Sequence, residues 1–233
     1  MKKQAASFNQ QVKDQSPVEI LKKAKEIFND EIIMASSLGA EDQLITDMIF
    51  KNNLSIPIFV LDTGRLNQET YDILDQTEKT YQFKFKLYFP ESSSVVELVK
   101  RDGINGFYQG IEQRKACCHV RKVEPLKRAL KNKKAWITGL RKEQAPTRKD
   151  LSICQVDEQN NCMKINPLLN WTETQVWEAI KKNQIPYNQL HDQNYPSIGC
   201  APCTRAIKSG EDTRAGRWWW ENPSQKECGL HKG

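Results

Sequence analysis

Short apolar runs alternate with amphipathic segments between residues 16 and 140 of the chain. Continuous apolar stretches occupy much of residues 31–37, 56–62 and 135–140. Apolar runs of this length without polar alternation are typical of parallel strands that are covered on both faces. Residues 83–89 instead alternate apolar and polar side chains, which favours a strand nearer the edge of the sheet.

Helical spacing of apolar positions separates these predicted strands. The clearest helix starts at Ser16, which we expect to be the N-cap, with Pro17 at the first helical position and Glu19 as the capping-box partner. Strands that alternate with helices predict a doubly wound, mostly parallel α/β sheet. The other helices predicted in this region occupy residues 40–52, 68–80, 93–101 and 122–130.

The pattern is weaker at both ends of the chain. Residues 1–15 are polar and predict a polar tail, and the sequence does not give their order. Residues 152–165 predict two short strands around a polar turn, and residues 171–183 predict a helix that is capped by Thr172. After residue 184 we expect mostly loop.

Composition limits the classes of protein to consider. The 233 residues suffice for one substantial core, and 38% hydrophobic with 27% charged residues is ordinary for a globular protein in water. No apolar run approaches the ~18 residues of a membrane helix, and the basic N-terminus lacks the apolar centre of a signal peptide. The formal charge of +6 is mild and includes no basic block. We therefore expect a cytoplasmic protein with no membrane or nucleic-acid partner.

Five of the seven cysteines stand where they suggest chemistry. Cys117 and Cys118 are adjacent, Cys200 and Cys203 form a C-x-x-C motif, and Cys228 stands alone five residues before the end. In a reducing compartment, clustered cysteines bind metal or react more often than they form stable disulfides. The two pairs supply four thiolates, as zinc or an iron–sulfur cluster requires. Adjacent helical residues diverge by ~100°, which favours a cluster of several irons over one zinc ion.

The remaining cysteine, Cys228, has two interpretations. It is a nucleophile if cations lower the pKa of its thiol, and His231, Arg214 and Arg217 could supply that field. Alternatively, it is an incidental cysteine near the end of the chain.

Two predicted strand ends could contact a nucleotide. Residues 36–42 (SSLGAED) follow one strand and precede a helix, where exposed N–H groups and the helix dipole suit an anion. Residues 62–65 (DTGR) follow the next strand, at the same edge of the sheet. Neither segment is a G-x-G-x-x-G or Walker A motif, and a solvated turn remains the alternative for each.

Together, several motifs in one order resemble the assimilatory adenylyl-sulfate (5′-phosphosulfate) reductases, relatives of the phosphoadenylyl-sulfate reductases. The motifs are SSLGAED, LDTGR followed by ETY, CCHVRKVEPL, TGLRKEQAPTR, LHDQNYPSIGCAPCTR, EDTRAGRWWWE and ECGLH. The resemblance covers most of the chain and implies an adenine nucleotide α-hydrolase-like fold. With the pattern above, it predicts a polar tail over residues 1–15, one nucleotide-binding domain that carries the cluster over residues 16–210, and a mobile catalytic tail over residues 211–233.

The resemblance also implies roles for individual residues. Cys228 would be the nucleophile with His231 beside it, Arg214 and Arg217 would contact the phosphosulfate, and Lys122 would lie between the cluster and the substrate. Some relatives have phenylalanine where this chain has leucine in SSLGAED, which leaves the role of the loop backbone intact. The ligands of a [4Fe-4S] cluster would be Cys117, Cys118, Cys200 and Cys203. Residues implied in substrate binding are Ser36, Ser37, Gly39, Asp62, Thr63, Arg65, Arg141 and Arg148.

The implied activity is that of an oxidoreductase acting on a sulfur group with a disulfide as acceptor. It would reduce adenosine 5′-phosphosulfate to sulfite and AMP through an S-sulfocysteine, in sulfate assimilation and cysteine biosynthesis. Thioredoxin or glutaredoxin would be the reductant. The cluster would have a structural and electrostatic role, and a homo-oligomer is compatible with the sequence.

Other interpretations remain open. The nearest is a reductase that uses 3′-phosphoadenylyl sulfate, alone or in addition, although relatives restricted to that substrate lack both cysteine pairs. An ATP-using enzyme of the same broad fold would require an intact ATP loop, from which SSLGAED departs. A non-enzymatic metal-binding module would leave Cys228 unexplained. The run Trp218-Trp219-Trp220 either packs over the pocket or offers a docking patch to thioredoxin.

Overall fold

The computed structural model describes residues 1–144 and 150–222 of the chain. These residues form a six-stranded sheet with the order β3-β2-β1-β4-β6-β5. Neighbouring strands are parallel except β5 and β6, which form an antiparallel hairpin at one edge. The prediction of a mostly parallel α/β sheet is therefore confirmed. The strands are Ile32–Ser36 (β1), Ile58–Leu61 (β2), Lys86–Tyr88 (β3), Ala135–Ile137 (β4), Cys154–Asp157 (β5) and Cys162–Ile165 (β6).

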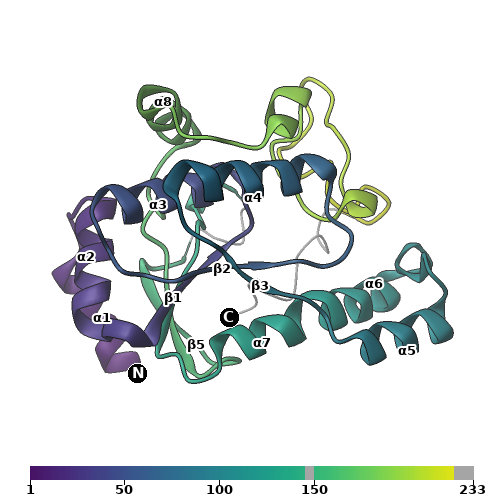
Figure 1. The fold of residues 1–233 in the computed structure, drawn as a ribbon, viewed down its shortest axis with the longest axis horizontal. Helices are drawn as coiled ribbons and strands as arrows, with labels where there is room; N and C mark the ends of the chain where they lie inside the picture. The colour runs from purple at the N-terminus through teal and green to yellow at the C-terminus, as the bar shows by residue number, and fades with distance from the viewer. Residues whose placement is uncertain (145–149, 223–233) are drawn as a thin grey trace.

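Helices cover both faces of the sheet (Figure 1), with α3 and α4 on one side and α5, α6 and α7 on the other. The α-helices are Lys2–Gln11 (α1), Pro17–Phe28 (α2), Ala40–Lys51 (α3), Gln68–Tyr81 (α4), Ser92–Asp102 (α5), Ile111–Cys118 (α6), Glu124–Leu130 (α7) and Glu173–Asn183 (α8). The short helical turns are Asn29–Glu31 (η1), Gly106–Tyr108 (η2), His119–Val123 (η3, a π-helix), Lys142–Gln144 (η4), Gln189–Gln193 (η6) and Ala201–Cys203 (η7). In the described part of the chain, none of these helices is long and apolar enough to cross a membrane.

Two predicted helix starts are present. The hydroxyl of Ser16 accepts a hydrogen bond from the Glu19 N–H at 3.3 Å, at the start of α2. Thr172 and Gln175 make both bonds of a capping box at the start of α8. These side chains satisfy N–H groups that would otherwise lack partners, which is why the helices begin there.

The central strand β1 contributes to two separate cores. Ile32 and Met34 point into the larger core, beneath α2 and α3, whereas Ile33 lies on the opposite face with Phe59 and Trp136. Because both faces of β1 are buried, its sequence is continuously apolar and does not alternate.

The N-terminal segment differs from the polar tail that the sequence predicts. Helix α1 occupies most of it, and Ala5 and Phe8 on the helix are buried together with Val12, which follows the helix as its C-cap. Phe8 packs against Phe28 with ring centroids 6.5 Å apart. Only three apolar side chains of this segment are buried, and they stand among polar neighbours. The hydrophobic pattern of residues 1–15 is therefore too sparse to predict that the segment packs on the core.

Helix α1 also covers the edge strand β5. The Asn9 amide nitrogen donates to the Cys154 carbonyl oxygen, and the Asn9 amide oxygen accepts from the Cys154 N–H, both at 2.8 Å. One side chain therefore satisfies the donor and the acceptor of a residue on an open sheet edge, where unpaired groups would invite association.

Phe8→Ala is expected to lower the free energy of unfolding by about 3–5 kcal/mol, because it removes a large buried side chain and leaves a cavity. Phe8 is only 2% exposed. Urea unfolding followed by circular dichroism would measure the change. Gln10→Ala, on the exposed face of the same helix, is the control and should change stability by less than about 0.5 kcal/mol. Equal, small effects of both substitutions would restore the tail interpretation.

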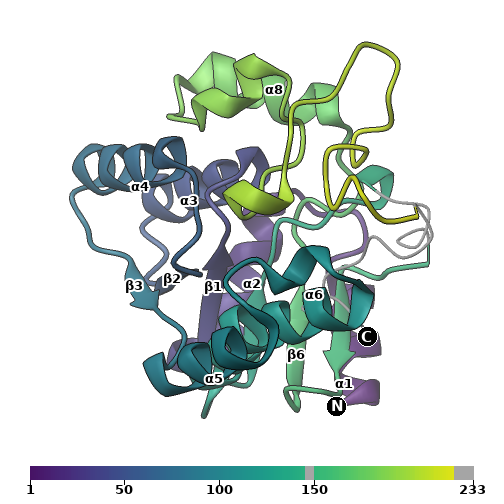
Figure 2. The same cartoon turned by 90° about the vertical axis from the view of Figure 1, so that its right-hand side faces the viewer.

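Residues 211–222, the first part of the predicted mobile tail, are packed against the rest of the protein. Figure 2 shows the yellow-green segment that follows α8 lying between α8 and α6. The Arg205 N–H donates to the Gly216 carbonyl at 3.0 Å, and Trp218 is buried. Backbone bonds and a buried aromatic side chain thus hold residues 211–222 in this structure, and the mobility of the tail stays a prediction. Residues 223–233 lie outside the described part.

Candidate active site

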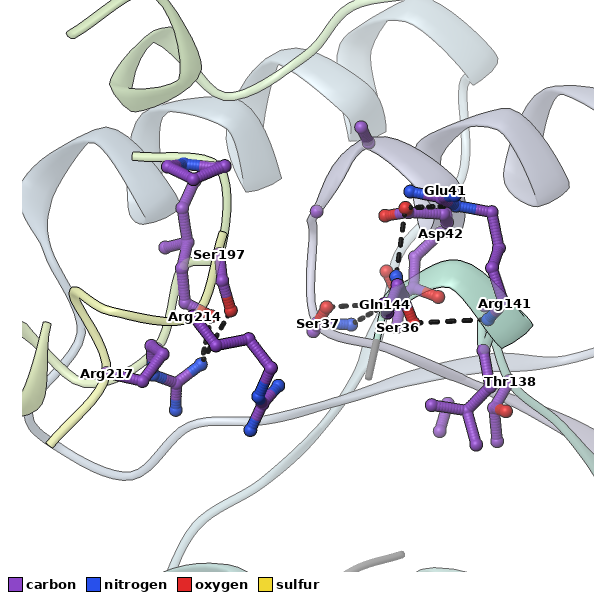
Figure 3. A pocket seen from close by; sticks show the side chains of 18 of the residues that line it. Ser36, Ser37, Glu41, Asp42, Thr138, Arg141, Gln144, Ser197, Arg214 and Arg217 are labelled. Atoms are coloured by element: carbon purple, nitrogen blue, oxygen red, sulfur yellow. Dashed lines mark hydrogen bonds and ion pairs between the residues drawn. The ribbon is translucent and has the colours of Figure 1, made fainter. Parts of the chain in front are cut away.

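A pocket of about 280 Å³ lies at the carboxyl ends of β1, β2 and β4. Figure 3 shows Ser36, Ser37 and Asp42 on one side, facing Ser197, Arg214 and Arg217 across the pocket. The first group extends from the last residue of β1 into the first turn of α3, and the second belongs to the segment after α8. Ligands of open α/β sheets bind at this position.

The loop between β1 and α3 is held in a defined shape by its own side chains. The Ser37 N–H and hydroxyl donate to Asp42 Oδ2 at 2.7 and 2.6 Å. Leu38 has a φ of 62°, which is uncommon for a residue other than glycine, and its N–H donates to the Ser36 hydroxyl at 3.1 Å. Ser36, Ser37 and Gly39 line the pocket at the N-terminus of α3. An anion placed there would meet the positive end of the helix dipole.

Asp42 has a perturbed carboxyl group. Burial raises its pKa to about 6, and the hydrogen bonds from Ser37 oppose this shift without cancelling it. Because the folded pKa exceeds the ordinary value of 3.8, the folded protein binds this proton more tightly than the unfolded chain does. The contribution to stability is therefore complete below pH 3.8 and is lost as pH rises through about 6.

Asp42→Asn is expected to remove this pH dependence. Wild-type stability should fall by about 2 kcal/mol relative to the variant between pH 4 and pH 7, since one pKa unit corresponds to about 1.36 kcal/mol. Urea unfolding of both proteins at several pH values measures the difference. Curves that stay parallel over this range would contradict the prediction.

The residues after β2 divide between two environments. Thr63 lines the pocket, and its hydroxyl lies 3.3 Å from Cys200 Sγ. Asp62 is buried, does not line the pocket, and accepts hydrogen bonds from the Gly64 N–H at 2.8 Å and from the Tyr71 hydroxyl at 3.0 Å. Thr63 is thus placed for ligand contact, whereas Asp62 orders the turn behind it.

Arg65 is directed away from the main pocket. Its guanidinium donates to the Ile104 carbonyl at 2.5 Å and to the Asn105 side chain at 3.3 Å, and it lies 5.1 Å from the centre of the Phe107 ring. The Arg65 backbone N–H donates to the Thr63 hydroxyl at 3.2 Å, but the Arg65 side chain does not line the pocket with the other predicted substrate-binding residues.

Arg141 lines the pocket, but acidic neighbours engage it. Its Nε donates to Glu41 at 2.8 Å, and its Nη1 donates to Glu143 at 3.2 Å. The Gln144 side chain donates to the same Glu41 oxygen at 2.9 Å. Two carboxylates compensate the charge of Arg141, so this arginine orders the pocket wall in the structure.

Basic side chains from two other segments line the same pocket. Lys122 lies on η3, and Arg214 and Arg217 lie on the segment after α8. Arg217 Nη1 donates to the Ile198 carbonyl at 3.1 Å. A Cβ at Gly199 would lie 2.4 Å from the Arg217 guanidinium, so glycine is needed for this approach. Cations that converge from separate segments suit an anionic ligand with several oxygens.

The four cysteines of the two predicted pairs come together in one cluster beside the pocket, with Phe107 and Trp218. Burial raises the pKa of Cys117, although Arg121 opposes the shift. Burial likewise raises the pKa of Cys203 to about 12, against an opposing effect of Lys122. Thiols of this kind are poor nucleophiles at neutral pH and become thiolates when metal binds.

Buried N–H donors around these cysteines fit an anionic group. Among the described residues, Arg121 Nε, Trp218 Nε1 and Trp220 Nε1 are buried without a hydrogen-bond partner. Such groups normally have a partner, and sulfur ligands of a metal centre accept this kind of bond. Across residues 1–144 and 150–222, no group of three or more His, Cys, Asp or Glu side chains is placed so that it could hold a metal ion. The chemistry of the four thiols and of the unpartnered donors fits an anionic metal–sulfur group.

The backbone between α6 and α7 forms a π-helical turn, η3, which the sequence does not predict. Cys117 and Cys118 end α6, and Lys122 lies within this turn. The His119 side chain is 53% exposed and pairs with Glu124 at 3.5 Å, so it faces away from the cysteine cluster. π-turns often occur at functional sites, where they change the direction of successive side chains.

Sequence analysis does not single out two residues of this region. Arg121 is buried, and its Nη1 donates to the Thr63 carbonyl at 2.6 Å. His191 lines the pocket, packs edge-on against Trp177 at 5.2 Å, and has a pKa lowered by burial. Both residues lie inside the recognised motifs, but no spacing rule distinguishes them from their neighbours.

Three predicted site residues, Arg148, Cys228 and His231, lie outside the described residues.

The parallel sheet, the loop at the end of β1 and the basic pocket define an adenine nucleotide α-hydrolase-like protein. The crystal structure of yeast FAD synthetase in complex with FAD is similar, with a TM-score of 0.56 at 15% identity. The likeness covers 87% of this chain and 75% of that chain, and it concerns the fold alone.

Sequence comparison gives the family. The model described as phosphoadenosine phosphosulfate reductase domain matches residues 31–206, and the chain belongs to this family. The adenosine 5′-phosphosulfate reductase of Allochromatium vinosum is 53% identical over 203 residues, which are 87% of this chain and 79% of the relative. The enzyme of the same name from Burkholderia cepacia is 49% identical over 203 residues, 87% of this chain and 81% of the relative.

A solved structure agrees with this assignment. The phosphoadenylyl-sulfate reductase from Candida auris, in a phosphate complex, has a TM-score of 0.76 and 30% identity, covering 89% of this chain and 98% of that chain. The resemblance stated from the motifs is therefore confirmed.

Proposed function

We propose that this protein is an oxidoreductase that reduces adenosine 5′-phosphosulfate to sulfite and AMP. The names of its relatives support this reaction. The structural observation that carries the proposal is one pocket, lined by Lys122, Arg214, Arg217 and the end of β1, that lies beside the cluster of four cysteines. This arrangement suits a nucleotide whose anionic end carries both a phosphate and a sulfuryl group.

The proposed reaction has two steps. The Cys228 thiolate attacks the sulfuryl sulfur, the bond from sulfur to the phosphate oxygen breaks, and AMP leaves with that electron pair. The product on the protein is an S-sulfocysteine. A thiolate of a dithiol protein, thioredoxin or glutaredoxin, then attacks Cys228 Sγ and releases sulfite. The second thiol closes a disulfide and regenerates Cys228, so the dithiol supplies two electrons.

The pocket residues would stabilise the charge that develops in the first step. Lys122, Arg214 and Arg217 line the same pocket and can contact the phosphate and sulfuryl oxygens. Ser36 and Ser37 would contact the same end of the nucleotide at the N-terminus of α3. His231 would lie beside Cys228, and Arg148 would add to the anionic pocket.

We propose that the two cysteine pairs hold a [4Fe-4S] cluster. Four thiols in one buried cluster and three unpartnered N–H donors around them support this assignment. When bound, the cluster would supply a rigid covalent tie between α6 and the turn Ala201–Cys203. It would not carry electrons in turnover.

The alternative substrate is 3′-phosphoadenylyl sulfate, alone or in addition. The similarity to the Candida auris phosphoadenylyl-sulfate reductase supports 3′-phosphoadenylyl sulfate as a candidate substrate. Rates on the two purified nucleotides, compared as kcat/KM, decide between them. The catalytic role of the tail, the cytoplasmic location and a homo-oligomer stay predictions.

Mass spectrometry of the protein mixed with adenosine 5′-phosphosulfate tests the proposal. We expect one SO₃ on the peptide that contains Cys228, and its loss as sulfite when reduced thioredoxin is added. Consumption of the nucleotide without a protein adduct, or an adduct on another cysteine, would contradict the mechanism.

A further inference from the structure

A buried ion pair joins α6 to the chain shortly before Cys228. Arg114 Nε donates to Glu221 Oε1 at 2.9 Å, and Arg114 Nη2 donates to Glu221 Oε2 at 2.7 Å. The two side chains are 1% and 3% exposed. A bidentate pair permits one relative orientation of its partners. Because desolvation offsets much of the attraction between buried charges, such a pair fixes geometry more than it adds stability.

The turn that carries Glu221 is restrained by its backbone as well. The Trp218 N–H donates to the Cys203 carbonyl at 3.1 Å, and the Glu221 N–H donates to the Trp218 carbonyl at 2.8 Å. Trp218 has a φ of 41°, a conformation that a bulky residue keeps only when its surroundings determine it. The turn at residues 218–221 therefore has a fixed position relative to both α6 and the cysteine cluster.

This turn is also continuous with the pocket wall. Trp218 and Arg217 both line the pocket. The guanidinium groups of Arg114 and Arg217 lie 4.7 and 4.8 Å from the centre of the Trp218 ring. Contacts thus run from Arg114 through Trp218 to Arg217, although Arg114 and Glu221 do not line the pocket themselves.

We propose that Arg114 and Glu221 are positioning residues, which fix the point from which Cys228 reaches the pocket. The proposal rests on the proposed function, in which the Cys228 thiolate attacks the bound nucleotide. Cys228 follows Glu221 by seven residues, so their Cα atoms lie at most about 25 Å apart. A fixed origin at the pocket wall raises the effective concentration of the thiol at the sulfuryl group.

Glu221→Gln tests this role, because it keeps the size of the side chain and removes the charge that pairs with Arg114. The single-turnover rate of SO₃ transfer to Cys228 should fall by about tenfold to a hundredfold, as expected when a reacting group loses its placement. The affinity for AMP and the iron content per chain should match those of the wild type, because Glu221 does not line the pocket. If Glu221 had a merely structural role, its substitution would lower the transfer rate, the affinity for AMP and the iron content together.

A second bidentate pair provides the control. Arg101 donates to Asp102 at 2.7 and 2.6 Å, at the end of α5. Asp102→Asn breaks that pair and leaves the pair of Arg114 and Glu221 intact, so it should leave the transfer rate unchanged.

The double variant Arg114→Met/Glu221→Leu guards against misfolding of the single variant. It leaves no unpaired buried charge, which favours folding. It also lacks the directional bonds, so its transfer rate should stay about tenfold below that of the wild type.

Two results would overturn this proposal. One is a wild-type transfer rate in Glu221→Gln or in Arg114→Met/Glu221→Leu. The other is a parallel loss of transfer rate, iron content and AMP affinity in both of these variants. A wild-type chain that takes up no SO₃ on Cys228 would contradict the proposed function too. A wild type that reacts, beside a Glu221→Gln variant that reacts equally fast, would contradict the positioning role alone.

Discussion

Cys228→Ser is expected to abolish sulfite formation while nucleotide binding persists. A serine hydroxyl is far less ionised than a thiol at neutral pH, and a sulfate ester on serine could not be released by thiol exchange. The loss should be on the order of 10⁴-fold or more, as for removal of other catalytic nucleophiles. Sulfite release with reduced thioredoxin measures the activity, and calorimetric titration with AMP measures binding.

The matched control is Cys154→Ala. Cys154 lies in the main core, and burial raises its pKa to about 12, so it has no thiolate available at neutral pH. This variant should keep wild-type kcat and KM. Sulfite formation by Cys228→Ser at the wild-type rate would show that another residue accepts the sulfuryl group.

Cys200→Ser is expected to remove the iron–sulfur cluster and, with it, activity. Serine is a much weaker iron ligand than a cysteine thiolate, and the remaining three thiols cannot complete the coordination. The substitution also changes the contact between Cys200 and the Thr63 hydroxyl, which joins the cluster region to the pocket. We expect loss of nearly all iron and of the brown colour, measured as iron per chain and as visible absorbance.

Iron content separates this prediction from the first one, since Cys228→Ser should retain full iron. Cys154→Ala serves again as the control and should also keep its iron. Stoichiometric zinc without iron in an anaerobic wild-type preparation would contradict the cluster assignment, and so would full iron in Cys200→Ser.

The hydrophobic pattern predicts the sheet well because β1, β2 and β4 are buried on both faces. It fails at α1, where Phe8 is the only large aromatic side chain among polar residues and its burial depends on Phe28 and β5. It also fails at η3, because a π-turn has no periodicity of its own to recognise. Short-range rules therefore succeed where burial is continuous, and they fail where a distant partner provides it.

The site shows the same division. The motifs predict that Ser36, Thr63 and Lys122 belong to one region, and the structure places all three around one pocket. They do not predict that Arg65 turns away to Ile104, because the segment 40 residues downstream that accepts its hydrogen bonds cannot be inferred from the DTGR motif.

By itself, the sequence determined the strand–helix alternation, the helix caps at Ser16 and Thr172, and the inventory of cysteines and basic residues. These features depend on the spacing of neighbouring residues and on side-chain chemistry, which a linear chain already contains. Only the tertiary structure decided which cations line the pocket and that Arg114 meets Glu221, 107 residues away, in a buried pair. Contacts of this kind depend on how the layers pack, since packing brings residues together regardless of their separation along the chain.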